Sequence, residues 1–351
     1  MNKNYNVDSL YRNEKKIKPL VVFTVILLII IIFSVIFLFS KVYRVANTLT
    51  NRAPEPFADV VENAMPTYTS TSFFSLDKSL MLEGWFFKRN TSAFRGNIIF
   101  VHNNRDNRVQ FGLETSELFS TFINEGFNVL AFDLRNSGRS DGEMSTYGYA
   151  EYKDVISAMQ HMYNFTGEKE FIIYGVGSGT SATLIAWNEL ETSSKVDADS
   201  YKIENTDLAV FKEDVIGMIL DTPVSTPDDY IRADIPNNTF LDRTIVSKFA
   251  PATIKATAGY TDDSNLIPLI SQFNQPVLIT RNIPNTRIES ESIDTIIDER
   301  LRLHPGTTTV FETAEAGHID GYLLEQENYL RQLTKFLDIW FPNLYPEETL
   351  E

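Results

Sequence analysis

The sequence predicts an α/β domain built on a mostly parallel β-sheet and preceded by one transmembrane helix. Two observations carry this prediction. From about residue 67 onward, short apolar runs typical of buried strands alternate with helical patterns, as expected for a sheet flanked by helices. Before the domain, residues 20–39 form a run of twenty residues without a charge. Twenty helical residues span about 30 Å, the thickness of the hydrocarbon core of a bilayer.

The apolar run at 20–39 has the length of an uncleaved signal anchor. The apolar part of a cleavable signal peptide is shorter, about 7–15 residues, and the following SKVYRVANT has no convincing small-residue cleavage site. Five Lys and Arg residues precede the run and three follow it within residues 40–52, which favours a cytoplasmic N-terminus and a main domain outside the cell membrane. We therefore expect a cytoplasmic tail (1–19), a single-pass transmembrane signal anchor (20–40), a connector (41–66) and an extracytoplasmic domain (67–351).

The charge of the chain is divided unevenly between these parts. Residues 1–52 contain eight of the 31 Lys and Arg residues and two of the 47 Asp and Glu residues, so the rest carries 23 basic and 45 acidic residues, a net charge of −22. A domain this acidic is repelled by a nucleic-acid backbone and by anionic lipid. We expect no nucleic-acid partner, and contact with the membrane through residues 20–40.

Cysteine is absent, which excludes disulfides, a cysteine nucleophile and thiolate metal sites. The four histidines lie far apart, with no pair at i, i+4 spacing. We therefore expect neither a metal ion nor a cofactor.

The pattern within the domain predicts the order of its elements. Residues 222–275 lack a strand pattern and are expected to form a small helical cap. Residues 325–340 have the periodicity of a closing amphipathic helix. Further helices are expected at 114–125, at 149–163 and after the glycine-rich turn at 175–179, and strands at 67–74, 80–87, 97–102, 128–133, 171–174, 216–221, 277–281 and 308–311.

Several segments of the domain resemble the segments of one known protein family and occur in the same order along the chain. They are LEGWFF, VHNN, FDLRNSGRSDGEMSTYGYAEYKDV, YGVGSGTSATLIA, ILDTP, PVLITRNIPN and AGHID. Together they resemble the α/β-hydrolase superfamily, in particular its membrane-anchored bacterial serine-hydrolase and peptidase-like branch. The most specific segment is DLRNSGRSDG, which is similar to the turn after the fourth strand of that family. The resemblance implies an α/β-hydrolase fold with roughly eight strands and a cap at about 222–275.

A serine hydrolase of this fold carries its nucleophile in a G-x-S-x-G turn. In this chain Gly175 and Gly179 flank the turn, and Gly177 stands at the nucleophile position, where it is inert. The backbone N–H of Ser178 matches one donor of the family's oxyanion hole. The side chain of Ser178 has two interpretations, a displaced nucleophile or an ordinary serine in the first turn of a helix.

The other catalytic positions also depart from the family pattern. Asn285 stands where an aspartate is expected, and an amide can orient an imidazole but cannot balance its positive charge. Asp221, Glu289 and Glu291 remain as replacement carboxylates.

The oxyanion loop reads His102-Asn103 in place of the usual His-Gly, with the N–H of Asn104 as the expected second donor. Loss of that glycine restricts the close backbone approach that a substrate carbonyl oxygen needs. Only His318, in AGHID, matches the family's base without a change.

Three altered positions around one retained base favour a protein that has lost serine-hydrolase activity and acts in binding or scaffolding. The alternative is an active hydrolase of small ester or peptide substrates that uses Ser178 and His318. A purely structural membrane protein is a third class. A small acyl or peptide ligand fits either of the first two hypotheses, and the sequence identifies no protein partner.

Overall fold

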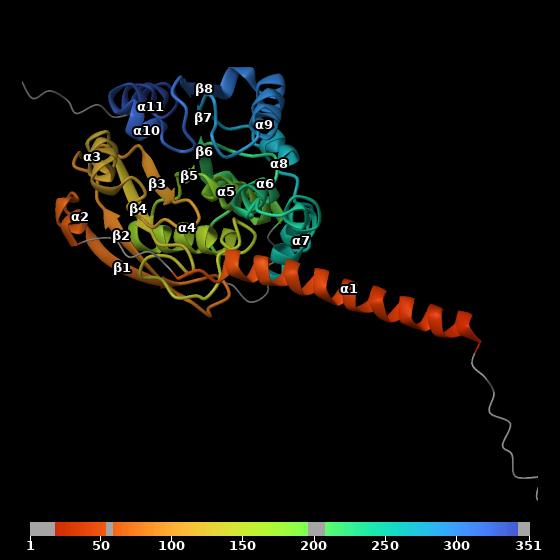
Figure 1. Ribbon diagram of the computed structural model, residues 1–351. Coiled ribbons are helices and arrows are strands. Elements are labelled where there is room, and N and C mark those ends of the chain that lie inside the picture. The colour runs from red at the N-terminus through yellow and green to blue at the C-terminus, as the bar shows by residue number, and fades with distance from the viewer. Residues whose placement is uncertain (1–17, 54–58, 196–207, 343–351) are drawn as a thin grey trace, which may run out of the picture.

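A computed structural model describes residues 18–53, 59–195 and 208–342, and its sheet has eight strands in the order β1-β2-β4-β3-β5-β6-β7-β8 (Figure 1). β1 pairs antiparallel with β2, and β2 pairs antiparallel with β4. All remaining pairs, from β4 through β3 and β5 to β8, are parallel. The predicted fold class, a mostly parallel sheet of roughly eight strands flanked by helices, is confirmed.

The strands lie within a few residues of their predicted positions. They are β1 (Thr69–Phe74), β2 (Met81–Phe87), β3 (Gly96–Val101), β4 (Phe127–Phe132), β5 (Phe171–Val176), β6 (Val215–Asp221), β7 (Val277–Asn282) and β8 (Thr308–Thr313). The helices are α1 (Pro19–Thr50), α2 (Asp59–Ala64), α3 (Thr115–Asn124), α4 (Tyr152–Thr166), α5 (Ser178–Glu189), α6 (Pro227–Asp234), the π-helix η5 (Asp242–Val246), α7 (Ser247–Thr257), α8 (Ile267–Gln272), α9 (Ser290–Leu303), α10 (Gly321–Leu324) and α11 (Gln326–Trp340).

The central strands are buried on both faces, which explains their apolar sequences. Every residue of β3, β4 and β5 is buried, as expected for parallel strands that helices cover on either side. One face packs against α4, α5, α9 and the cap helices, and the other against α3 and α11. This arrangement brings the carboxyl ends of the parallel strands, and the loops that follow them, to one edge of the sheet.

The segment predicted as a cap, 222–275, contains α6, η5, α7 and α8. The predicted tail, 1–19, lies outside the described residues except for its last two positions. The predicted connector at 41–66 is helical in two parts, because α1 continues as far as Thr50 and α2 covers Asp59–Ala64. α1 is long and apolar enough to cross a membrane.

The loop after β4 is held by a buried ion pair. Arg108 Nη2 lies 2.6 Å from Asp133 Oδ2, and both side chains are almost fully buried. The same carboxylate also accepts the backbone N–H groups of Arg108 (2.8 Å) and Arg139 (2.7 Å). Gly138, at φ 48°, approaches so closely that a Cβ there would lie 2.0 Å from Asp133 Oδ2.

Gly138→Ala is expected to destabilise the domain by about 3 kcal/mol or more, because the new methyl group displaces the carboxylate of a buried ion pair and forces a positive φ on alanine. Denaturant unfolding of the full chain in detergent measures the change. Gly306→Ala is the matched control, since a Cβ at Gly306 meets no atom within 4 Å. Equal stabilities of the two variants would contradict this account of the turn.

Candidate active site

The strand-to-helix turn of the nucleophile position lies between β5 and α5. Gly177 has φ 56° and ψ −126° and donates its N–H to the carbonyl of Asp221 at 3.0 Å. A Cβ at Gly179 would lie 2.4 Å from the carbonyl oxygen of Val101, and a Cβ at Gly175 would lie 2.8 Å from the carbonyl oxygen of Gly179. The outer glycines of the motif therefore let the helix approach the strands closely, and the middle position keeps the left-handed conformation that favours glycine.

The space beside Gly177 is filled by the side chain of Asn103. A Cβ at Gly177 would lie 2.3 Å from Asn103 Oδ1 and 2.7 Å from Asn103 Cγ. A serine at this position would meet the asparagine before its hydroxyl reached any substrate. Asn103 in the oxyanion loop therefore leaves no room for a side chain at Gly177 in the elbow.

The two expected oxyanion donors are engaged by side chains of the chain itself. The N–H of Ser178 donates to Asn103 Oδ1 at 3.1 Å, and the N–H of Asn104 donates to Ser178 Oγ at 2.8 Å. In a hydrolase these donors stabilise the negative oxygen that develops on the substrate. Here the amide oxygen of Asn103 and the hydroxyl oxygen of Ser178 accept these donors in place of a substrate oxygen.

Hydrogen bonds on all sides hold the Asn103 side chain in place. Its Nδ2 donates to Asp106 Oδ2 at 3.0 Å and to the carbonyl of Asn104 at 3.1 Å. Its backbone N–H donates to Gln110 Oε1 at 2.7 Å, and Gln110 in turn donates to Asp106.

The preceding residue, His102, anchors the same loop to the segment that follows β4. Its Nε2 accepts the N–H of Leu134 at 2.9 Å, so the proton of the neutral ring sits on Nδ1 and is donated to the carbonyl of Asn103 at 2.7 Å. Burial lowers the pKa of His102, which keeps the ring neutral.

His318 follows β8 and faces the predicted acid position. Its Nδ1 lies 3.3 Å from Asn285 Oδ1, and Asn285 Nδ2 donates to the carbonyl of His318 at 3.3 Å. Asn285 Oδ1 also accepts the backbone N–H groups of Arg287 (3.0 Å) and Ile288 (2.9 Å). The amide therefore orients the imidazole, but it supplies no negative charge.

The electrostatic surroundings keep His318 neutral. Burial, together with the positive charge of Arg287, lowers the pKa of His318 to about 4, although Asp320 and Asp234 act in the opposite direction. The ring of Tyr230 lies beside the imidazole at a tilted angle, with the two ring centroids 5.7 Å apart. A base with so low a pKa has little tendency to take a proton from a hydroxyl group at neutral pH.

The remaining predicted residues do not join His318 in the part of the chain that the structure describes. Ser178 Oγ is hydrogen-bonded to Asn104 and Asn103. Asp221 is fully buried, and its carboxylate accepts from Tyr329 at 3.3 Å. Glu289 and Glu291 are exposed at the start of α9. Among the described residues, none of these four forms a hydrogen bond or ion pair with the imidazole.

Asp234, at the end of α6, was not predicted as part of this site. Its buried carboxylate pairs with Arg105 of the oxyanion loop (3.1 Å) and accepts the hydroxyl of Tyr147 (2.7 Å). It also pairs with Arg287, two residues beyond the acid position. The cap is thereby tied to both loops of the site. No sequence signal could have found this contact, because its members come from four separate segments.

Comparison with known proteins identifies the fold of the domain. No family model matches the sequence. An uncharacterized protein, YqkD of Bacillus subtilis (strain 168), is 20% identical over 228 residues, which cover 64% of this chain and 67% of that protein. Among solved structures, the Pyrococcus furiosus esterase Pf2001 superposes with a TM-score of 0.61 at 16% identity, over 83% of this chain and 100% of that one.

Two further solved structures are similar. An alpha-beta hydrolase from Vibrio vulnificus has a TM-score of 0.54 at 17% identity, over 83% of this chain and 89% of that one. An acylaminoacyl peptidase from Pyrococcus horikoshii has a TM-score of 0.54 at 12% identity, over 84% of this chain and 44% of that one. The chain has the α/β-hydrolase fold.

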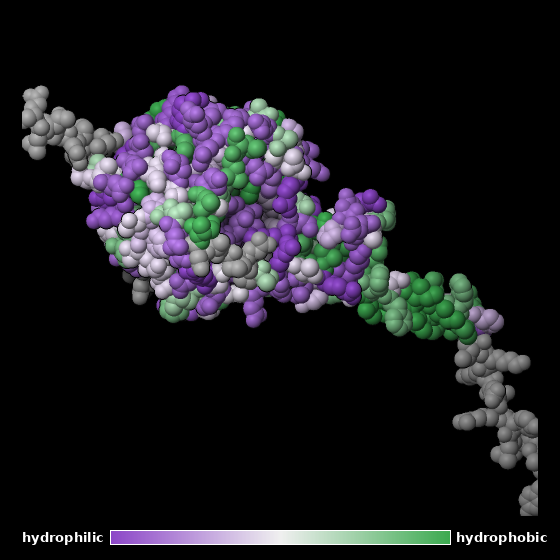
Figure 2. Space-filling view, turned by 60° about the vertical axis from the view of Figure 1, so that its left-hand side comes forward, coloured by the Kyte–Doolittle hydropathy of each residue, from purple (hydrophilic) through white to green (hydrophobic). Residues whose placement is uncertain are grey.

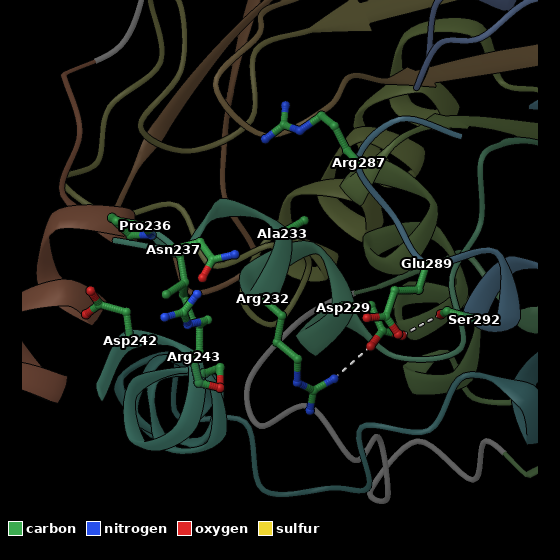
Figure 3. A pocket seen from close by; sticks show the side chains of 12 residues that line it. Asp229, Arg232, Ala233, Pro236, Asn237, Asp242, Arg243, Arg287, Glu289 and Ser292 are labelled. Atoms are coloured by element: carbon green, nitrogen blue, oxygen red, sulfur yellow. Dashed lines mark hydrogen bonds and ion pairs between the residues drawn. The ribbon is translucent and has the colours of Figure 1, made fainter. Parts of the chain in front are cut away.

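In this domain of α/β-hydrolase fold, a small hollow lies beside Ser178. The hollow lined by Asn104, Tyr147 and Ser178 has a volume of about 10 Å³, which is close to the minimum for one water molecule. A larger cleft of about 670 Å³ lies elsewhere, between α6, α7 and the start of α9 (Figure 3). Of these two spaces, the cleft at the cap is the one large enough for a ligand.

Asn285→Asp is expected to raise the pKa of His318 by about one to three pH units, because a carboxylate beside the ring stabilises its charged form. In the wild-type chain the neutral ring costs stability as the pH falls from 6.5, the ordinary pKa, to about 4, since the unfolded state binds the proton first. The substitution narrows the pH range over which this stability is lost. Histidine-selective NMR titration measures the pKa.

Asn124→Asp, an exposed change on α3, is the control and should leave the pKa of His318 where it is. If Asn285→Asp leaves it there as well, Asn285 does not contact the imidazole.

Proposed function

We propose that this chain is a membrane-anchored binding protein that has lost the serine-hydrolase activity of its fold. The observation that carries the proposal is the hydrogen bond from the Ser178 N–H to Asn103 Oδ1. It occupies the donor that a hydrolase offers to its substrate. The charge distribution around residues 20–39 supports an N-terminus in the cytoplasm and a domain on the outer side of the cell membrane.

The size of the expected loss supports the same conclusion. Removing one member of a catalytic triad lowers the rate by about 10⁴–10⁶, and the residual acceleration of about 10³–10⁴ comes from the oxyanion hole and substrate binding. In this chain the nucleophile is absent at Gly177, the acid is an amide at Asn285, and the oxyanion donors are engaged internally. The usual source of residual activity is therefore blocked as well.

The alternative, a hydrolase that uses Ser178, has less support. The hydroxyl of Ser178 accepts the N–H of Asn104, and the residue as a whole is only 4% exposed. Attack by this hydroxyl would break the bond to Asn104 and would need a base nearby. The low pKa of His318 makes its imidazole a poor base for this step.

The cleft at the cap is the best candidate for the ligand site. Asp229 pairs there with Arg232 (2.7 Å) and Asp242 with Lys41 (2.8 Å). Within the described ranges, the side chains of Arg243 and Glu289 form no ion pair, and Figure 3 shows them at opposite ends of the cleft. A ligand with an acidic group at one end and an amine at the other matches this arrangement, which favours a short peptide over an acyl chain.

The full-length chain in detergent is expected not to react with a fluorophosphonate probe, and Ser178→Ala should give the same result. The variant Gly177→Ser/Asn103→Gly/Asn285→Asp restores a nucleophile, opens the oxyanion donors and supplies the acid. We expect labelling in this variant alone. Gel fluorescence after incubation with the probe measures it.

The matched control is Gly177→Ala/Asn103→Gly/Asn285→Asp, which has the same backbone changes without a hydroxyl at 177. Labelling of the wild-type chain that disappears in Ser178→Ala would overturn the non-catalytic proposal.

The peptide Lys-Gly-Gly-Glu is expected to raise the midpoint temperature of thermal unfolding of the full chain. At a peptide concentration of 100 times its Kd, binding adds about 2.7 kcal/mol to the free energy of unfolding. Arg243→Gln and Glu289→Gln should each abolish the shift, since each removes one end of the site. Glu291→Gln, exposed in the first turn of α9 but outside the cleft, is the control. A shift with octanoate and none with the peptide would reject a peptide ligand in favour of an acyl one.

A further inference from the structure

The last turns of α1 are bound to the cap, so the helix is no free stalk. Leu38 is partly buried, and Val42, Ala46 and Leu49 are buried in the same core as the cap helices. Their spacing of three to four residues places them on one face of α1. Figure 1 shows α7 beside this part of the helix, and Figure 2 shows the apolar surface of α1 in direct contact with the largely hydrophilic domain.

The contact extends into the uncharged run of α1. Leu241, just before η5, lines one apolar hollow together with Ile30, Phe33, Phe37 and Leu38. These four residues of α1 belong to the run at 20–39. Leu241 of the cap therefore lies beside the part of α1 that is long and apolar enough to span a membrane.

An ion pair fixes the position of the cap along α1. Lys41, the first charged residue after the run, lies 2.8 Å from Asp242 Oδ1 and donates to Thr239 Oγ1 at 2.9 Å. Phe33 precedes Lys41 by eight residues, which is about 12 Å of helix. Leu241 thus lies on the membrane side of Lys41, at a depth comparable with the roughly 5–10 Å reached by interfacial amphipathic segments.

The neighbouring residues have the chemistry of a bilayer surface. Phe240 is 72% exposed although it is a large apolar side chain. Tyr43, one turn from the end of the run, is 56% exposed, and tyrosine is enriched at the level of lipid headgroups. The charge of Asp242 is balanced by Lys41. This edge of an acidic domain therefore has two apolar side chains, Phe240 and Leu241, beside an acidic residue whose charge is balanced.

We propose that Phe240 and Leu241 insert into the outer part of the leaflet that faces the domain, so that the cap is held at the bilayer surface beside α1. The inference rests on the proposed membrane crossing of α1. The partner is the lipid itself, and zwitterionic lipid suffices because the contact is apolar. Since Asp242 also lines the cleft at the cap, that cleft opens next to the membrane.

Single cysteines labelled with the fluorophore NBD test this insertion, because the natural chain contains no cysteine. The full chain is reconstituted in phosphatidylcholine vesicles with and without doxyl-labelled lipid. Labels at Phe240→Cys and, as a second position, Leu241→Cys are expected to be quenched at least half as strongly as a label at Phe33→Cys inside the run. A label at Ile339→Cys, exposed on α11 away from α1, should not be quenched.

The four labelled positions distinguish insertion of the cap from the membrane crossing of α1. If the label at 33 is quenched while those at 240 and 241 resemble 339, insertion of the cap is wrong and the membrane crossing of α1 stands. If the label at 33 is not quenched, both the crossing and the insertion fail.

Discussion

The hydrogen bond between the Ser178 N–H and Asn103 Oδ1 depends on the absence of a side chain at Gly177. A Cβ there would lie 2.3 Å from the oxygen that accepts the bond. The glycine at the elbow and the asparagine in the oxyanion loop are therefore two halves of one packing arrangement. A buried N–H without an acceptor is costly, about 1–3 kcal/mol, and the Asn103 side chain provides this acceptor where a hydrolase leaves the donor open for substrate.

The remainder of the site is consistent with this closed arrangement. His102 fixes the loop that carries Asn103, and Asn285 holds His318 without giving it a counter-charge. Asp234 ties the cap to the oxyanion loop. The α/β-hydrolase scaffold keeps the carboxyl ends of its strands together, as it would for catalysis. The side chains gathered there bind one another, and the larger cleft lies at the cap.

The sequence predicted the parts of the structure that depend on local pattern. β3 to β6 were recognisable because strands buried on both faces read as continuous apolar runs. Gly177 and Asn285 became candidate positions in the sequence because the glycines and loops around them keep the family's spacing.

The packing of Asn103 against Gly177 could not be predicted, since it joins residues 74 positions apart. Asp234 was missed for the same reason. The docked part of α1 was predicted as a connector because its composition is polar, although Val42, Ala46 and Leu49 form a narrow apolar face that only the cap explains.

Amide hydrogen exchange at Ser178 tests the central claim most directly, in the full chain in detergent and in the Asn103→Gly variant. If Asn103 Oδ1 accepts the Ser178 N–H, that amide should exchange about threefold to tenfold faster in the variant, as expected for the loss of one hydrogen bond. Amides in the interior of α5 should be unchanged. Equal, fast exchange of the Ser178 amide in both proteins would mean that the oxyanion donor is open and would contradict the account.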